Sequence, residues 1–290
     1  MLPVPLDLPT PLVHPDWLAG ALGHPDLVVI DASWYLTAMG RDARQEYERA
    51  HVPGAVFWDL DALSDTASPL PHMLPAAADF AREVGGLGIG SGHAVVVYDG
   101  SGNNLSAPRV WWTFRVFGHD RVAVLDGGFA AWMAAGHAVE GGSVRRPAAR
   151  FDARFRPDMV RSLEAMRSLV STGGAQVLDA RGRGRFAGSE PEPRAGVRSG
   201  HHPGARNLPY GELVGPDGAV LPAAELERRL RGAGIDLSRP VVTTCGSGVT
   251  ACALALALDL VGHSDYAVYD GSWTEWATRS DTPVDTGPPA

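Results

Sequence analysis

Short apolar runs alternate with longer segments of mixed polarity along the first half of the chain. Four runs rich in β-branched residues are predicted to be strands: residues 27–31, 55–58, 94–98 and 122–125. The predicted helices are residues 14–22, 43–49, 76–84, 107–117 and 128–134. Strands that alternate with helices indicate an α/β fold, in which a mainly parallel sheet is flanked by helices on both faces.

The second half of the chain repeats the first. Four short blocks recur in the same order at a nearly constant separation, and their key residues pair as Asp31 with Asp179, His51 with His201, Asp99 with Cys245, and Asp126 with Asp270. We therefore expect two tandem copies of one domain, residues 1–139 and 158–290, joined by a linker rich in Gly, Pro and Arg at residues 140–157. Because Asp99 stands where the second copy has Cys245, the first copy is expected to be catalytically inert.

Cys245 is the strongest candidate for chemistry. It follows the apolar run Val-Val-Thr-Thr and precedes Gly-Ser-Gly-Val-Thr and an apolar helical segment, a pattern that predicts strand, tight loop and helix. Ligands of open α/β sheets bind beyond the carboxyl ends of the strands. The N–H groups of such a loop and the positive end of its helix favour an anion, and the thiolate is the nucleophilic form of cysteine.

The composition narrows the possible partners and compartment. The chain has 290 residues, is 45% hydrophobic and has a net charge of −8, which argues against nucleic acid or an anionic membrane as a partner. No apolar stretch is long enough to span a bilayer, and the beginning of the chain shows no secretion signal. Two cysteines make no disulfide framework or metal knuckle, so we expect a reducing, cytoplasmic location, with Cys252 buried in the helix after the loop. All 25 basic residues are arginine, which excludes a lysine Schiff base.

These features together resemble the tandem rhodanese-domain sulfurtransferases over nearly the whole chain. The loop Cys245-Gly-Ser-Gly-Val-Thr is similar to that of the 3-mercaptopyruvate branch, whereas the thiosulfate branch typically has two basic residues after the cysteine. Further blocks that resemble this branch begin at Asp31, Gly40, Ser68 and Gly188. The resemblance implies sulfur transfer from 3-mercaptopyruvate through a persulfide on Cys245, without a cofactor or metal. The acceptor would be thioredoxin, a small-molecule thiol or cyanide.

The resemblance also implies site residues. Arg185 and Arg194 would bind the carboxylate and keto oxygen of the substrate, for which the planar guanidinium is suited. Their alternative role is as solvated loop residues, and Arg181 and Arg183 could share the substrate role. The persulfide would lie among the N–H groups of the loop residues Gly246, Ser247, Gly248, Val249 and Thr250.

The resemblance further implies a relay of Ser247, His72 and Asp61 that moves the proton. Such a relay is chemically reasonable, since histidine titrates near neutral pH and an aspartate can fix its tautomer. The alternative for His72 is a surface loop residue, and for Asp61 a cap or turn residue. Asp59 and Asp65 are the next candidates for the aspartate.

Three other functions remain to be weighed. A phosphatase loop requires Cys-x5-Arg, and Ala251 stands at the arginine position. A thiosulfate:cyanide sulfurtransferase and a non-catalytic binding module of the same fold are the remaining alternatives. His51, His201, Asp31 and Asp179 are expected to be structural because they recur in both copies, and Trp111, Trp112, Trp132 and Trp276 are expected to lie in the core.

Overall fold

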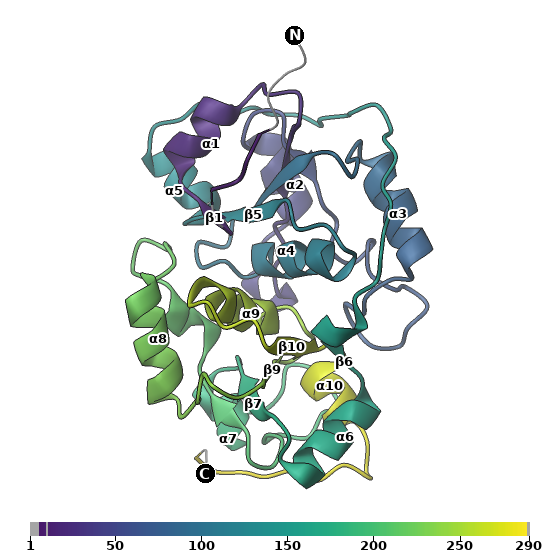
Figure 1. The fold of residues 1–290 in the computed structure, drawn as a ribbon, viewed down its shortest axis with the longest axis vertical. Coiled ribbons are helices and arrows are strands. Elements are labelled where there is room, and N and C mark those ends of the chain that lie inside the picture. Colours follow the sequence, from purple (N-terminus) through teal and green to yellow (C-terminus); the bar gives the residue numbers. More distant parts are fainter. Residues whose placement is uncertain (1–5, 10, 289–290) are drawn as a thin grey trace. The chain divides into compact units, whose positions relative to one another are not determined.

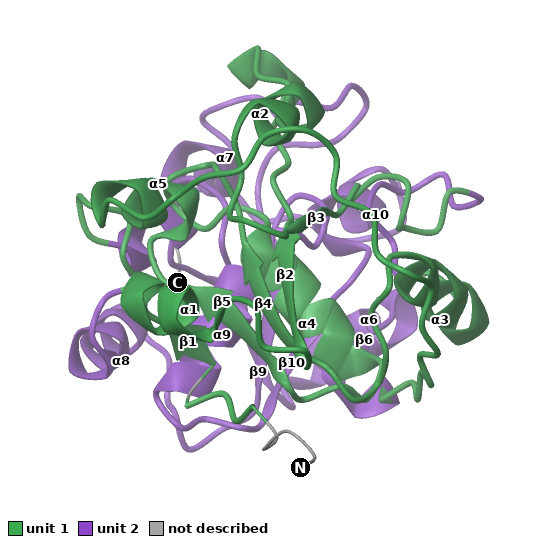
Figure 2. Ribbon diagram, turned by 90° about the horizontal axis from the view of Figure 1, so that it is seen from above, with its two compact units in different colours: residues 1–66, 75–156, 215–220 green, residues 67–74, 157–214, 221–290 purple. Residues whose placement is uncertain are grey.

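The computed structural model describes residues 6–9 and 11–288, and it divides into two compact units. Unit 1 comprises Met1–Thr66, Pro75–Arg156 and Gly215–Val220, and unit 2 comprises Ala67–Leu74, Pro157–Val214 and Leu221–Ala290 (Figure 2). Each unit thus includes a short segment from the other half of the sequence. Residues 1–5, where no secretion signal was expected, lie outside the described residues.

Unit 1 contains a five-stranded parallel sheet with strand order β1-β5-β4-β2-β3. Its strands are β1 (Leu12–Val13), β2 (Leu27–Asp31), β3 (Val56–Phe57), β4 (Ala94–Tyr98) and β5 (Val122–Leu125). Its helices are α1 (Pro15–Ala21), α2 (Ala43–Arg49), α3 (Ala77–Gly86), α4 (Ala107–Val116) and α5 (Gly128–Ala134), with a 3₁₀ turn, η1 (Thr37–Met39).

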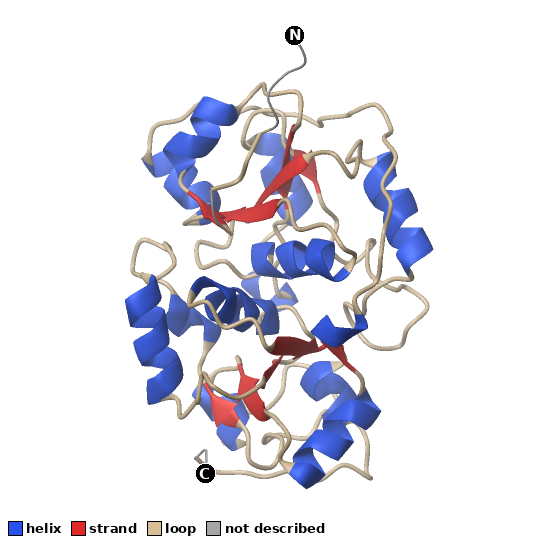
Figure 3. Cartoon of the chain, in the orientation of Figure 1, coloured by secondary structure: helices blue, strands red, loops and turns tan. Residues whose placement is uncertain are grey.

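Unit 2 has the same architecture, with strand order β6-β10-β9-β7-β8 and every pairing parallel. Its strands are β6 (Val160–Arg161), β7 (Gln176–Asp179), β8 (Arg206–Asn207), β9 (Val241–Thr244) and β10 (Tyr266–Tyr269). Its helices are α6 (Leu163–Thr172), α7 (Arg183–Ala187), α8 (Ala223–Gly232), α9 (Ala251–Leu260) and α10 (Ser272–Ala277), and its 3₁₀ turns are η2 (Pro157–Met159) and η3 (Tyr210–Leu213). Helices flank both sheets (Figures 1 and 3), which confirms the predicted fold class.

The predicted elements of the first copy are confirmed, with small shifts at their ends. β2, β4, β5, α2 and α5 have the predicted bounds. β3 is shorter than predicted because only Val56 and Phe57 pair with β2 at the edge of the sheet. The two-residue edge strand β1 has too few residues for a pattern, and the sequence did not predict it.

Residues 140–156, which were expected to form most of the linker, belong to unit 1. Phe151 is 5% exposed and contacts the rings of Phe80 and Phe114 in that unit. An aromatic side chain buried in this way anchors the segment to the domain core. Apart from the two short exchanged segments, the change from unit 1 to unit 2 therefore falls between Arg156 and Pro157.

The residues expected to be structural are buried as predicted. Trp111, Trp112, Trp132 and Trp276 are all at most 1% exposed. His51 and His201 play matching parts: the Nδ1 atom of each contacts a backbone oxygen, of Tyr47 at 2.7 Å and of Phe186 at 2.9 Å. The repeated histidines are thus part of the scaffold.

His202 is a completely buried histidine in the core of unit 2. Its ring lies 5.1 Å from that of Trp273 and 4.7 Å from that of Trp276, and neither ring nitrogen has a hydrogen-bond partner within the described residues. Burial lowers the pKa of His202 to about 3. The neutral imidazole is therefore the form that the folded protein accommodates.

The burial of His202 predicts that the folded protein loses stability in acid. Between about pH 6.5, where the unfolded histidine titrates, and about pH 3, the unfolded state binds one proton more. As the pH drops through that range, His202 should lower the free energy of unfolding by about 1.4 kcal/mol per pH unit. Above about pH 6.5 the stability contributed by the neutral His202 is fully present. Urea unfolding at several pH values measures the slope.

The matched variant is His202→Val, because Val52 occupies the corresponding position of unit 1. This variant should lose stability at pH 7 by leaving a cavity, but its pH slope should be smaller by one proton. An unchanged slope would contradict the assignment.

Candidate functional site

The loop after β9 carries Cys245, which is 2% exposed, and leads directly into α9. The beginning of α10 fixes its backbone: the Cys245 oxygen accepts a hydrogen bond from Trp273 N at 3.0 Å, and Cys245 N donates to Ser272 Oγ at 3.3 Å. The Gly246 oxygen accepts from Thr274 N at 3.0 Å. Gly248 has φ +78°, a conformation that glycine adopts without strain. Ser272 and Thr274 hold this loop, and no motif in the sequence identifies them for that role.

Ser247 lies next to a histidine from the first half of the sequence. His72 belongs to the segment Ala67–Leu74, which is part of unit 2, and its Nδ1 atom lies 2.9 Å from Ser247 Oγ. Both side chains are buried, at 5% and 7% exposure. The alternative of a surface loop histidine is therefore wrong for His72. A buried hydroxyl–imidazole pair of this kind can transfer a proton.

Asp61 belongs to unit 1, where it is exposed and accepts a hydrogen bond from Trp34 Nε1 at 3.1 Å. Asp59 caps the same turn, because its Oδ1 atom accepts from Ala62 N at 3.0 Å. The structure thus brings Ser247 and His72 together, and a part in the relay for Asp61, or for Asp59 or Asp65, stays a prediction.

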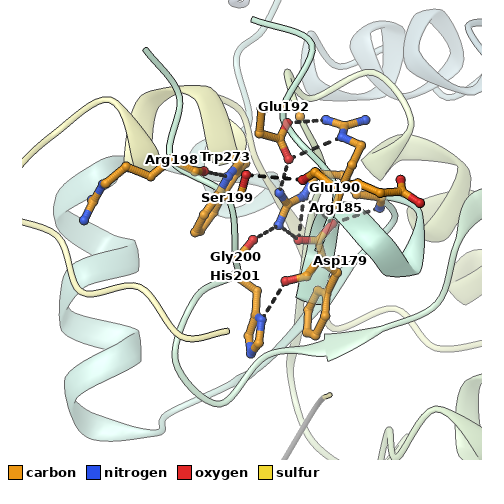
Figure 4. A network of polar contacts seen from close by, with 12 residues as sticks. Asp179, Arg185, Glu190, Glu192, Arg198, Ser199, Gly200, His201 and Trp273 are labelled. Atoms are coloured by element: carbon orange, nitrogen blue, oxygen red, sulfur yellow. Dashed lines mark hydrogen bonds and ion pairs between the residues drawn. The ribbon is translucent and has the colours of Figure 1, made fainter. Parts of the chain in front are cut away.

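Arg185 is the arginine beside the cysteine loop. Its Nη2 atom lies 3.0 Å from the position that a Cβ atom on Gly246 would take, and it forms an ion pair of 2.5 Å with Glu192 (Figure 4). The Arg185 side chain is 25% exposed and that of Glu192 is 3% exposed. A buried carboxylate therefore holds a partly exposed guanidinium next to Gly246.

The neighbouring arginines have different environments. Arg181 is buried and forms ion pairs with Asp179 at 2.6 Å and Glu192 at 2.7 Å. Burial alone would lower the pKa of Arg181, but these carboxylates raise it above its ordinary value, so the guanidinium is charged. Its donors are engaged with protein groups, including the Gly200 oxygen at 2.7 Å, which gives Arg181 a structural role.

Arg183 pairs with Glu212 on the surface, where its side chain is 62% exposed. Arg194 is partly buried and, within the part of the chain that the structure describes, forms no ion pair. The sequence indicated the four arginines but not which were already paired. Asp179 and Glu212 set Arg181 and Arg183 apart, whereas Glu192 pairs with both Arg181 and Arg185.

In the equivalent loop of unit 1, the side chain of Asp99 accepts hydrogen bonds from backbone N–H groups. The backbone oxygen of Asp99 accepts a hydrogen bond from Phe129 N at 3.0 Å, as the backbone oxygen of Cys245 does from Trp273 N. Asp99 and Cys245 therefore occupy the same structural position. The Asp99 carboxylate accepts from the N–H groups of Ser106 at 2.9 Å and Ala107 at 2.8 Å, at the start of α4. A carboxylate thus occupies the anion-binding end of this helix.

Cys252, predicted to be buried, is 0% exposed and donates to the Gly248 oxygen at 3.2 Å. Both cysteines are free thiols. The arrangement around Cys245 therefore combines a buried thiol, a guanidinium and a hydroxyl–imidazole pair, a set suited to nucleophilic catalysis on a small anion.

Comparison with known proteins agrees with this chemistry. The model of the rhodanese-like domain matches twice, at residues 14–135 and 162–279. The 3-mercaptopyruvate sulfurtransferase of Rattus norvegicus is 46% identical over 93% of this chain and 92% of the relative. The thiosulfate sulfurtransferase of Cricetulus griseus is 45% identical over 91% of each chain.

Among solved structures, SseA of Escherichia coli, described as a 3-mercaptopyruvate sulfotransferase, superposes with a TM-score of 0.84. It is 40% identical, over 91% of this chain and 99% of SseA. The repeated domain and these matches show that the chain belongs to the rhodanese family, among the sulfurtransferases that carry two rhodanese-like domains.

Proposed function

We propose that this protein is a 3-mercaptopyruvate sulfurtransferase. The observation that carries the proposal is that the Arg185 guanidinium lies beside Gly246. Gly246 directly follows Cys245 in the cysteine loop. A guanidinium matches the planar carboxylate of an α-keto acid, and Gly246 and Ser247 add no further cations for a dianion. The relatives named for 3-mercaptopyruvate support this choice of donor.

The reaction begins with attack of the Cys245 thiolate on the sulfur of 3-mercaptopyruvate. A new S–S bond forms, the C–S bond breaks, and its electron pair remains on the carbon as the enolate of pyruvate. Arg185 and Arg194 bind the carboxylate and keto oxygen and stabilise the developing charge. A proton reaches the enolate carbon through Ser247 and His72, which gives pyruvate and the Cys245 persulfide.

The second step regenerates the enzyme. An acceptor thiolate attacks the outer sulfur of the persulfide, the S–S bond breaks, and the Cys245 thiolate leaves. The acceptor departs as a persulfide, or as thiocyanate if the acceptor is cyanide. Between the two steps the N–H groups of Gly246, Gly248, Val249 and Thr250 stabilise the bound sulfur. The acceptor we propose is a thiol, from thioredoxin or a small molecule.

We place the reaction in a reducing compartment, the cytoplasm, because a free catalytic thiol must stay reduced. A plant relative, sulfurtransferase 1 of Arabidopsis thaliana, is named as mitochondrial. Within residues 6–9 and 11–288, no helix has both the length and the apolar character needed to cross a membrane.

Intact mass spectrometry tests the donor. Incubation with 3-mercaptopyruvate should add about 32 Da, one sulfur atom, and release an equal amount of pyruvate. Thiosulfate should load the protein more slowly at equal concentration. Loading from thiosulfate alone would identify a thiosulfate sulfurtransferase, which relatives such as that of Cricetulus griseus make the second candidate. A protein that takes sulfur from neither donor would be a binding module.

A further inference from the structure

The loop that carries His72 has a conformation that needs support. His72 has φ 59°, in the left-handed region that costs energy for a residue other than glycine. Such a backbone persists only where its surroundings fix it. The side chain must nevertheless keep Nδ1 at 2.9 Å from Ser247 Oγ. The residues that hold the backbone of this segment therefore also determine whether His72 stays in contact with Ser247.

Asp270 supplies the support. It follows β10, is 4% exposed, and its Oδ2 atom accepts a hydrogen bond of 2.8 Å from the backbone N–H of Leu74, two residues after His72. A carboxylate acceptor in a buried site makes a strong hydrogen bond. The aspartate thereby joins the segment Ala67–Leu74 to the sheet of unit 2.

The same turn also holds the nucleophile. Two residues after Asp270, Ser272 Oγ accepts from Cys245 N at 3.3 Å, and Trp273 N donates to the Cys245 oxygen at 3.0 Å. One short turn between β10 and α10 is thus bonded to the cysteine loop and to the histidine loop. A displacement of the turn would change the geometry of both.

We propose that Asp270 is a positioning residue for sulfur transfer: it fixes His72 at the Ser247 hydroxyl through the Leu74 N–H. This inference rests on the proposed function, in which Ser247 and His72 move the proton. Asp270 needs no contact with the substrate for this role, and its effect should appear in the rate of the proton-dependent step more than in donor binding.

The duplication provides a matched control. In unit 1, Asp126 occupies the position of Asp270, and its Oδ1 atom accepts from Val220 N at 2.7 Å. That bond holds the segment Gly215–Val220, which contains no histidine and no proposed site residue. The two aspartates therefore make the same kind of bond to the same kind of segment, and only Asp270 supports the relay.

The experiment compares Asp270→Ala with Asp126→Ala, using the full chain, 3-mercaptopyruvate and the release of pyruvate. Asp270→Ala should lower kcat about 10-fold, a part of the roughly 100- to 10,000-fold that a general acid–base group contributes, and change KM less than about twofold. Asp126→Ala should change kcat less than about twofold even if its melting temperature falls equally. Equal kcat losses in the two variants would overturn the proposal.

A conservative variant and a double mutant separate positioning from loss of folding. Asp270→Asn keeps an oxygen that can accept the Leu74 N–H, so it should keep kcat within about threefold of the native value. His72→Ala with Asp270→Ala should be no slower than His72→Ala alone, because the two act through one group. Losses that multiply would refute the role of Asp270.

Failure of the wider proposal would look different. Without sulfur loading of the native protein, the proposed function fails. With normal loading but no effect of His72→Ala, the relay fails and the role of Asp270 with it. If Asp270→Ala does not fold, Asp270→Asn and Asp270→Ser serve in its place: serine is too short to reach Leu74, so it should be slow while asparagine is not, and equal rates would overturn the proposal.

Discussion

Replacing Cys245 with serine is expected to abolish sulfur transfer. A hydroxyl cannot form a persulfide and is far less ionised than a thiol, so the rate should fall at least about 1,000-fold. Intact mass after incubation with 3-mercaptopyruvate should show no added sulfur, and no pyruvate should appear. The fold should survive, since the loop is held through backbone atoms of Cys245.

Cys252→Ser is the matched control, because this second free thiol is buried in the first turn of α9, directly after the cysteine loop. A serine there can still donate to the Gly248 oxygen, as the Cys252 thiol does at 3.2 Å. This variant should gain one sulfur from the donor at a rate within about threefold of the native protein. Sulfur on the Cys245→Ser variant, or none on the Cys252→Ser variant, would contradict the assignment of the nucleophile.

Replacing Arg185 with glutamine is expected to cause the second large loss. The guanidinium beside Gly246 should bind the substrate carboxylate, and the loss of a charged hydrogen bond of this kind costs about 10- to 100-fold in affinity. KM for 3-mercaptopyruvate should rise by that factor, and kcat should fall as well if the same cation stabilises the enolate. Steady-state kinetics of pyruvate release measures both.

Arg183→Gln is its control, since Arg183 is only two positions away but is exposed and paired with Glu212. Its KM should change less than about twofold, as expected for a surface ion pair. Arg181→Gln should instead lower the stability, because it leaves Asp179 buried without its cation and removes one of the two cations that pair with Glu192. Equal KM values for the Arg183 and Arg185 variants would show that the carboxylate binds elsewhere.

The fold was predictable because its strands are buried on both faces. β2 and β4 have only buried residues, so their sequences are continuous apolar runs with clear ends. The edge strand β1 has two residues and leaves no such pattern. The repeated blocks predicted that Asp99 and Cys245 stand at equivalent positions, and their matching backbone hydrogen bonds confirm that correspondence.

The sequence allowed prediction of the nucleophile, whose residue type and context indicate its chemistry, but not of the contacts around it. Cys245 lies at the end of a strand and before a helix, a context that can be read along the chain. The difference between Arg181 and Arg185 depends on which guanidinium is buried. Both pair with Glu192, and Arg181 pairs in addition with the buried Asp179, which the order of residues along the chain does not reveal. The hydrogen bond of Leu74 to Asp270 joins residues from opposite halves of the chain, and local patterns contain no trace of it.

The carboxylate of Asp99 has a consequence for any attempt to give unit 1 a nucleophile of its own. The loop of unit 1 keeps its shape with a covalently attached anion in place of a transient one, bonded to Ser106 N and Ala107 N. The carboxylate thus satisfies the two N–H groups at the start of α4 without any bound ligand. Asp99→Cys would introduce a thiol but remove those bonds, so an active loop in unit 1 would also need another partner for the two N–H groups.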